Sequence, residues 1–175
     1  LTWMILGILL GGRLGYVLFY QPAYYLAHPF EIVMIWTGGM AFHGGLLGVV
    51  IAAFFYFRRN LVPYASGADV IALSTPMGLL LGRLANFINA ELWGRPTDLP
   101  WGVVFPGQAA QACGQAVGLC ARHPSQLYEA ALEGLLLGVV LAVMAFRYNA
   151  LKRPGLITGA FFTIYGLSRC LVELV

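Results

Sequence analysis

Five long apolar stretches constrain this chain more than any other feature of its sequence. They run over residues 1–20, 32–57, 65–88, 126–146 and 156–175. Each is long enough to cross a bilayer as a helix, which takes about 20 residues. Helices are expected because no water in the hydrocarbon core can satisfy backbone groups, and because the leucine, alanine and glycine runs lack the alternation of a membrane β-barrel. The sequence therefore predicts an all-α, polytopic transmembrane helix bundle with about five spans.

Composition excludes two other classes of protein. The chain is 60% hydrophobic and only 10% charged, with a mean hydropathy of +0.80, which is far from an ordinary soluble domain. Its formal net charge of +3 comes from scattered basic residues, so no nucleic-acid partner is expected. The sequence begins with Leu1, ends in an apolar run and carries no cleavable signal, so we expect a fragment of a longer protein.

The basic residues outside the stretches predict the orientation. Five of them lie in the connections at 58–64 and 147–155, whereas the other connections carry a mixture of charges. The positive-inside rule puts these five in the cytoplasm. Segment 91–124 then lies outside the cell membrane as a turn-rich arm with four prolines, and 101–105 could form a short strand. We treat 1–175 as a single transmembrane domain that includes this arm.

A histidine with two glycines on either side interrupts the second stretch. His43 lies between Gly38-Gly39 and Gly44-Gly45. Four glycines in eight residues weaken a helix enough to permit a break, and they let a ligand or another backbone come close. A neutral imidazole here could act as a general base. The alternative is a histidine hydrogen-bonded inside a helix bundle, with glycines that serve helix packing.

The end of the third stretch carries an unusual set of polar residues. Arg83 and Asn86 are three positions apart and share a helical face, and Asn89 and Glu91 follow. The planar fork of an arginine suits a phosphate, so the pattern indicates an anion site. The alternative is a structural ion pair of Arg83 with Glu91 or Glu133, which would also neutralise the buried charge.

Two further stripes of polar residues must face inward. The fourth stretch carries Gln126, Glu129 and Glu133, and the fifth carries Tyr165, Arg169 and Glu173. A purely structural charge network is a competing interpretation, because the intramembrane arginines and glutamates balance in number. Arg13, in the first stretch, lies among Gly11, Gly12 and Gly15, which could equally mark a tight helix crossing.

The three cysteines do not indicate a metal or cofactor site. Cys113 and Cys120 both fall in the arm, where oxidising conditions would allow a disulfide without requiring one. Cys120 and His123 have poor spacing for zinc and lack a second ligand pair, so no metal is expected. Cys170 lies inside a span and is interpreted as a small buried residue.

Four motifs together resemble one enzyme family. Gly82-Arg-Leu-Ala-Asn-Phe-Ile-Asn-Ala-Glu-Leu-Trp-Gly94 is similar to the signature of the bacterial prolipoprotein diacylglyceryl transferases. Gly38 to Gly45, Arg122 to Ala130, and Tyr165 to Arg169 with Glu173 follow in the order of that family. The resemblance covers nearly the whole chain. The given sequence lacks the family's earlier transmembrane segment and its last span, so the resemblance also predicts a fragment.

The resemblance implies an activity, its partners and its residues. It implies transfer of the diacylglyceryl group of phosphatidylglycerol to the lipobox cysteine thiol of a prolipoprotein signal peptide, at the outer face of the bacterial inner membrane. The products are a thioether and glycerol 1-phosphate, and no cofactor is implied. The implied catalytic residues are His43, Arg83 and Arg169. The implied substrate-binding residues are Arg83, Asn86, Glu91, Gly94, Glu173 and, less strongly, Tyr16.

Two functions from other classes remain open from the sequence. Inward-facing arginines on glycine-rich, broken helices also build a transporter or channel for a small anion. The chain has no sign of the two-fold internal repeat that is common in transporters. A structural membrane scaffold is the third interpretation, but it gives the histidine and the arginines no role.

Overall fold

The computed structural model describes residues 2–112 and 119–174, which fall into two compact units. Unit 1 comprises Leu1–Gly67 and unit 2 comprises Ala68–Val175. The boundary lies near the start of α4 (Tyr64–Ile88), so the first residues of this helix belong to unit 1. Each unit is described by itself.

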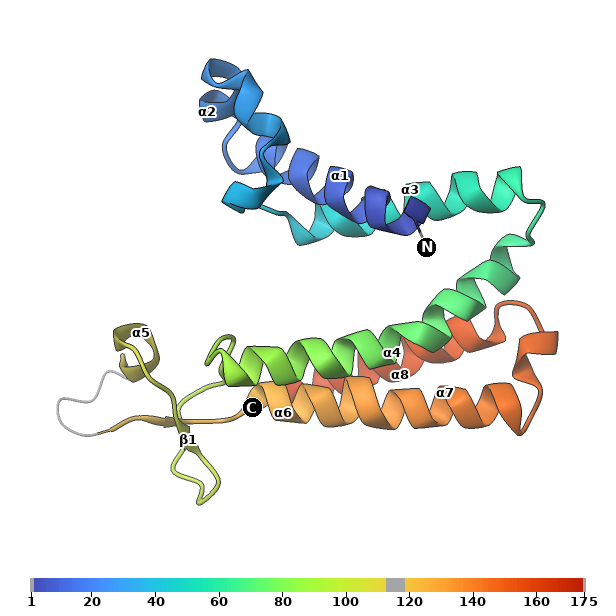
Figure 1. Cartoon of the computed structure of the whole chain (residues 1–175). Helices are drawn as coiled ribbons and strands as arrows, with labels where there is room; N and C mark the ends of the chain where they lie inside the picture. Colours follow the sequence, from blue (N-terminus) through green and yellow to red (C-terminus); the bar gives the residue numbers. More distant parts are fainter. Residues whose placement is uncertain (1, 113–118, 175) are drawn as a thin grey trace. The chain divides into compact units, whose positions relative to one another are not determined.

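Unit 1 is built on two helices that pack through glycine. Helices α1 (Thr2–Phe19) and α3 (Phe42–Arg59) lie side by side (Figure 1). A Cβ at Gly11 would collide with the carbonyl oxygen of Gly44, and a Cβ at Gly48 would collide with that of Gly7. Backbones approach this closely only where side chains are absent, as in the small-residue crossings of membrane helices. The tight crossing that the glycines around Arg13 predict is therefore confirmed.

The second predicted stretch, residues 32–57, is wrong in its first part. Helix α2 (Pro22–Ala27) and the short 3₁₀ helices η1 (Pro29–Val33) and η2 (Ile35–Thr37) come first, and α3 begins only at Phe42. Gly38 and Gly39 have φ angles of 85° and 79°, which end any helix that precedes them. The apolar run is thus continuous in the sequence, but the helix is broken at Gly38 and Gly39, where the sequence allows a break.

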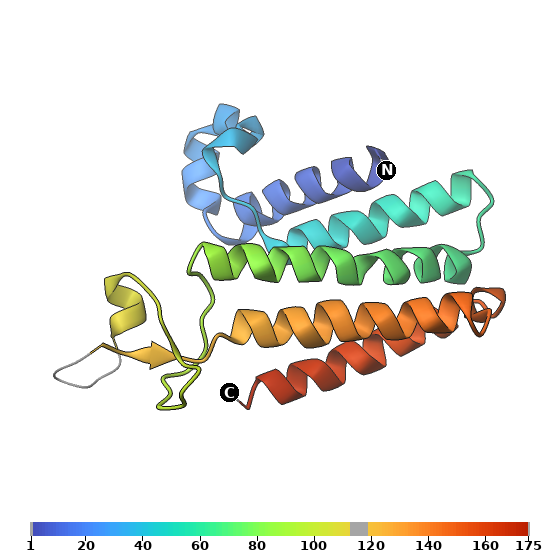
Figure 2. The same ribbon diagram turned by 60° about the horizontal axis from the view of Figure 1, so that its bottom comes forward.

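Unit 2 is a bundle of three long helical segments (Figures 1 and 2). Helix α4 packs beside a continuous segment made of α6 (Ser125–Glu129), the π-helical turn η3 (Ala130–Leu136) and α7 (Leu137–Phe146). The short η4 (Ala150–Lys152) leads into α8 (Leu156–Val172). Leu137, Leu141 and Ile157 are fully buried and form the centre of the core.

A buried aspartate on α4 caps the start of α8. Asp69 is fully buried, and its carboxylate accepts hydrogen bonds from the backbone N–H groups of Gly155 and Thr158, both at 2.8 Å. The Thr158 hydroxyl donates a third bond of 2.7 Å. Free N–H groups at a helix N-terminus favour a negative charge, so this residue fixes α8 against α4.

The arm between α4 and α6 contains little regular structure. Strands β1 (Val103–Val104) and β2 (Ala121–Arg122) form an antiparallel pair, and α5 (Gln108–Gln111) lies between them in sequence. The short strand expected within 101–105 is confirmed. The pairing of Cys113 with Cys120 cannot be followed, because Cys113 lies outside the described residues.

The helices confirm the prediction of a polytopic helical membrane bundle. Among the described residues, three helices are long and apolar enough to cross a membrane, over Thr2–Phe19, Tyr64–Ile88 and Ser125–Phe146. Helix α3 reaches 18 residues but ends in Arg58 and Arg59, and α8 is a shorter apolar helix. These two occupy the remaining predicted stretches.

Candidate active site

Three helices of unit 2 bring two arginines onto one buried glutamate. Arg83 comes from α4, Glu129 from the end of α6 and Arg169 from α8. Arg83 Nε lies 2.8 Å from Glu129 Oε2, and Arg169 Nη1 lies 2.5 Å from Glu129 Oε1. The Glu129 side chain is only 9% exposed. The Glu129 carboxylate thus partly neutralises the charges of two arginines that lie 46 and 40 residues away in the sequence.

Arg169 contacts two further carboxylates. Its Nη2 donates a 2.9 Å hydrogen bond to Glu173, an exposed residue one helical turn later. Its Nη1 lies 3.5 Å from the fully buried Glu133. The inward orientation predicted for both polar stripes is confirmed at Glu129, Glu133 and Arg169. It is wrong at Glu173, whose side chain is 68% exposed at the end of α8. The proposed ion pairs of Arg83 with Glu91 or Glu133 are wrong, since its partner is Glu129.

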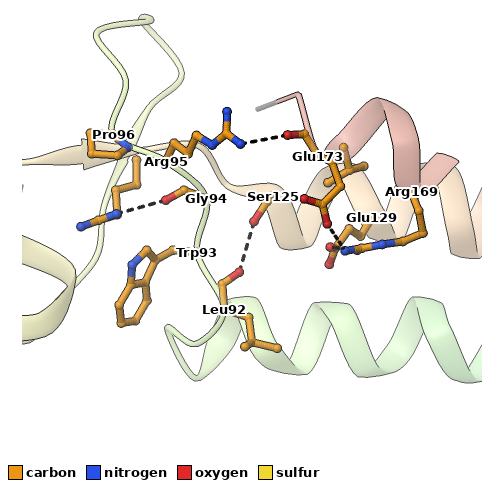
Figure 3. Close-up of a pocket in the computed structure, with 11 residues that line it drawn as sticks. Leu92, Trp93, Gly94, Arg95, Pro96, Ser125, Glu129, Arg169 and Glu173 are labelled. Atoms are coloured by element: carbon orange, nitrogen blue, oxygen red, sulfur yellow. Dashed lines mark hydrogen bonds and ion pairs between the residues drawn. The ribbon is translucent and has the colours of Figure 1, made fainter.

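An open cavity of about 420 Å³ lies beside this cluster (Figure 3). Arg169, Glu129 and Glu173 form one side, and the start of the arm forms the other. Arg95, on the arm side, donates a 3.2 Å hydrogen bond to the backbone carbonyl of Glu173. The cavity is lined by Leu92, Trp93, Gly94, Arg95, Pro96, Arg122, Ser125, Glu129, Arg169, Val172 and Glu173. Three arginines therefore face a space that can hold an anionic group.

The turn after α4 contains the predicted Glu91, directly before Leu92, where the cavity lining begins. Glu91 N–H donates to the Asn86 carbonyl at 2.9 Å, and Ala90 N–H donates to the Phe87 carbonyl at 3.1 Å. With Ala90 at a φ of 56°, this is a Schellman helix end with alanine where glycine is usual. The Glu91 side chain is exposed, and the Asn86 side chain is half-buried on the last turn of α4.

Two residues at the start of α6 hold this turn in place. The fully buried Gln126 donates from Nε2 to the Glu91 carbonyl at 2.5 Å, and the Ser125 hydroxyl donates to the Leu92 carbonyl at 3.1 Å (Figure 3). Strand β2 and the residue after it hold Gly94 in place. The Gly94 N–H donates to the His123 carbonyl at 2.9 Å, and the Gly94 carbonyl accepts a 3.2 Å hydrogen bond from Arg122.

Gly94 has no room for a side chain. A Cβ there would lie 2.9 Å from the Cβ of His123 and 3.0 Å from the His123 carbonyl oxygen. Glycine is therefore required where the chain leaves α4 and passes the strand that leads to α6. This gives a structural reason for Gly94 beside the substrate-binding role that the resemblance implies.

His43 and Tyr16 belong to unit 1 and lie at either side of the turn that precedes α3: Tyr16 contacts Gly39, and His43 follows in the first turn of α3. His43 is the second residue of α3 and is exposed in this unit, with its ring 5.6 Å from that of Phe42. Within the described part of unit 1 its imidazole has no hydrogen-bond partner. The Tyr16 ring stacks on Tyr20 at 5.4 Å and lies against Gly39, where a Cβ would approach it to 2.6 Å. Of the predicted residues, Gly94, Arg169 and Glu173 line the cavity, and Arg83 is joined to it through Glu129. Asn86 and Glu91 belong to unit 2 but are not part of the cavity lining, and His43 and Tyr16 belong to unit 1.

Sequence reasoning missed the residues that organise the cavity. The sequence pattern places Glu129 only within a polar stripe, although it contacts both arginines. The pattern does not indicate Arg95, Arg122, Ser125 or Gln126 as site residues. Glu129, Ser125 and Gln126 form one helical turn of unusual polarity before an apolar run, and this signal could have identified them. Arg122 begins one of the family motifs, but neither Arg95 nor Arg122 has a side-chain partner that a sequence pattern could indicate, because both donate to backbone carbonyls. Among the described residues, no group of His, Cys, Asp and Glu side chains could hold a metal ion.

Comparison with known proteins gives a consistent result over the whole chain. A family model described as prolipoprotein diacylglyceryl transferase matches residues 1–175. A phosphatidylglycerol–prolipoprotein diacylglyceryl transferase of Ruegeria pomeroyi is 72% identical over 173 residues, which cover 99% of this chain and 59% of the relative.

Relatives with the same description occur in other bacteria. The protein of Roseobacter denitrificans is 63% identical over 99% of this chain, and that of Bradyrhizobium diazoefficiens is 54% identical over 97%. The alignments cover 59% and 57% of those two proteins. The chain therefore spans less than two thirds of the length of the curated relatives it matches.

Proposed function

Because this chain belongs to the prolipoprotein diacylglyceryl transferase family, a family of multi-pass membrane proteins, we propose that the protein containing it transfers a diacylglyceryl group from phosphatidylglycerol to a prolipoprotein. The acceptor is the thiol of the lipobox cysteine in the signal peptide. The products are a thioether-linked lipid and glycerol 1-phosphate. No cofactor takes part in this proposal.

One observation carries the proposal beyond the family name. Arg169, Arg95 and Arg122 line one open cavity. Arg83 contacts Glu129, a residue of the same lining that also binds Arg169. Arg83 uses only Nε for that carboxylate, and among the described residues its two terminal nitrogens have no hydrogen-bond partner. A phosphodiester that enters the cavity would find guanidinium groups already oriented by buried contacts. Such donors stabilise the charge of a leaving phosphate without reorganisation.

The reaction balances without any group beyond the two substrates and the protein. The thiol loses its proton to a base, and the sulfur attacks the diacylglyceryl carbon that carries the phosphate oxygen. The S–C bond forms as the C–O bond breaks, and the electron pair leaves on the phosphate of glycerol 1-phosphate. Arg83 and Arg169 stabilise that developing dianion, and His43 accepts the thiol proton.

The remaining predicted residues have binding roles in this proposal. Asn86, on the last turn of α4, and Glu91, at the turn that follows, would bind the glycerol head group through an amide and a carboxylate. Glu173 would do so from α8 while it orients Arg169. Gly94 leaves the backbone open beside the cavity. Tyr16 would contact substrate from unit 1.

We propose that the protein lies in the bacterial inner membrane with the cavity toward the outer leaflet. Arg147, Lys152 and Arg153 follow the far end of α7, whereas the cavity is lined by residues at the start of α6 and the end of α8. The positive-inside rule assigns the basic end to the cytoplasm. A lipid head group and a secreted peptide would then both reach the opposite end.

The test uses a full-length protein that contains this sequence. The purified protein is incubated with phosphatidylglycerol and a lipobox peptide, and the peptide is analysed by intact mass. The proposal predicts a gain of one diacylglyceryl group on the cysteine and none on a peptide with serine in its place. Flux of a small anion without modification of the peptide would instead indicate the transporter or channel.

Three substitutions test the assigned roles. His43→Gln and Arg83→Ala should each abolish lipidation while the protein still inserts into the membrane. Arg83→Lys should also fail, because an ammonium group cannot reproduce the planar fork that holds Glu129 and a phosphate together. Retained thioether formation in any of the three variants would overturn the role assigned to that residue.

A further inference from the structure

Arg13 in unit 1 is a buried arginine without a carboxylate partner. It is 3% exposed, and among the described residues no acidic side chain lies within ion-pair distance of it. All of its hydrogen bonds go to backbone carbonyls. A buried charge is expensive unless it is fully hydrogen-bonded, so the segments that supply these carbonyls must be arranged around it.

The carbonyls come from two segments that lie between α2 and α3. Nε donates to Ile32 at 2.8 Å and Nη2 donates to Glu31 at 2.6 Å. Nη1 donates to Gly38 and, at 3.2 Å, to Gly39. The ring of Tyr25 closes one face of the guanidinium, with its centroid 5.1 Å from Cζ. Arg13 therefore joins η1 to the glycine turn that precedes α3.

The same turn is tied to α1 at a second point. Ala41 N–H donates to the Gly12 carbonyl at 2.9 Å, and Ala41 is the residue before the first turn of α3. His43 follows two residues later. The position at which α3 begins, and with it the direction of the His43 side chain, depends on the glycine turn that Arg13 holds.

We propose that Arg13 is a positioning residue for His43. Its guanidinium fixes the turn at 38–41, and this turn sets where the imidazole lies when it accepts the thiol proton. The inference rests on the proposed function, because it needs His43 to be the base. The charged groups around the turn are Arg13 on α1 and Glu31 on η1, and the Glu31 carboxylate already accepts a 2.8 Å bond from the Tyr24 hydroxyl.

The test compares Arg13→Lys with Arg59→Lys in the full-length protein. A lysine at 13 keeps the charge but cannot reach four carbonyls from one nitrogen, whereas Arg59 is exposed at the end of α3 and makes none of these contacts. We expect kcat/KM at neutral pH to fall about 10- to 100-fold in Arg13→Lys, the size expected for a reacting group displaced by about 1 Å. Arg59→Lys should match the wild type.

The pH profile separates positioning from loss of folded protein. In the wild type, kcat/KM should reach its plateau below about pH 8.5, the pKa of a free thiol, because the protein assists the loss of the thiol proton. In Arg13→Lys the rise should move toward about pH 8.5, where the thiol ionises without help. A smaller folded fraction would scale the whole profile and leave its midpoint unchanged. That result, or wild-type kinetics, would overturn the inference.

Failure of the proposed function would look different. If the wild-type protein leaves the lipobox peptide unmodified, the proposed transfer itself is wrong. If the wild type transfers the lipid and His43→Gln has the same pH profile, the role of His43 is wrong. Only transfer that depends on His43, with an unchanged midpoint in Arg13→Lys, counts against Arg13 alone.

Discussion

Glu129 determines how the two arginines of the candidate active site are oriented. It is buried and lies within 2.8 Å of Arg83 and 2.5 Å of Arg169, on three different helices. Removal of one partner from a buried ion pair leaves uncompensated charge behind. We predict that Glu129→Gln lowers the free energy of unfolding by roughly 3 kcal/mol. It should also lower lipid transfer by the full-length protein, because both guanidinium groups lose their common anchor.

Glu173→Gln is the matched control for stability. The Glu173 side chain is 68% exposed and contacts Arg169 one helical turn away. Exposed pairs of this kind contribute at most about 1 kcal/mol, so the free energy of unfolding should change little. Denaturant unfolding in detergent micelles measures both variants. Equal destabilisation by the two substitutions would contradict the view that Glu129 is the central anion.

Ala90 is strained at the end of α4. It has a φ of 56°, which non-glycine residues adopt only at a free-energy cost. We predict that Ala90→Gly raises the free energy of unfolding by roughly 0.5–1 kcal/mol, because glycine adopts this conformation freely. Ala85→Gly, which lies within the same helix at the beginning of its last turn, should lower it by up to about 1 kcal/mol. Thermal unfolding of the two variants should therefore shift in opposite directions, and a shared direction would contradict the helix end described here.

The packing of α1 against α3 depends on which face of α3 carries each glycine. A Cβ at Gly44 would collide with the Gly11 carbonyl oxygen, whereas a Cβ at Gly45 would lie 3.7 Å from the nearest atom, the Ile8 carbonyl oxygen. We predict that Gly44→Ala separates the helices and destabilises unit 1 by roughly 1–3 kcal/mol, as overpacking does. Gly45→Ala should be neutral or stabilising, since alanine favours a helix.

Hydrogen exchange of the amides in α1 and α3 checks this pair of variants. Faster exchange is expected in Gly44→Ala alone. Faster exchange in both variants, or in neither, would show that the glycines do not define the crossing.

Hydropathy predicts the helices well because every span in lipid must be apolar and must satisfy its own backbone hydrogen bonds. The ends of the first, third, fourth and fifth stretches agree with α1, α4, α6–α7 and α8 to within a few residues. The second stretch failed at residues 32–41, where apolar side chains continue while the backbone leaves the helix. Hydropathy reports side chains alone, whereas the break depends on Arg13 of α1, which binds backbone carbonyls of this segment from outside it.

The site was predictable in its charges and not in its pairing. Arg83 and Arg169 stood out because charges are rare in apolar spans, and the structure places both on one side of unit 2. Their common partner could not be chosen from the sequence, because Glu129 and Glu133 are one helical turn apart on the same stripe. The π-helical turn of η3 changes the register there, and no sequence pattern predicts it.

Across the whole molecule, the proposed function assigns different parts of one reaction to the two units. In this proposal the arginines of unit 2 stabilise the leaving phosphate, and His43 of unit 1 accepts the thiol proton. The proposed mechanism requires that one protein couples both events. Thioether formation and phosphate release must then occur together, once per turnover.

The measurement is the ratio of glycerol 1-phosphate released to diacylglyceryl group gained by the lipobox peptide. Both are quantified by mass spectrometry in one reaction of the full-length protein with phosphatidylglycerol. We expect a ratio of about one in the wild type, since the C–O bond breaks only as the S–C bond forms. We also expect loss of both products in Arg83→Ala. Release of glycerol 1-phosphate without a modified peptide, or a modified peptide without that release, would contradict the coupled mechanism.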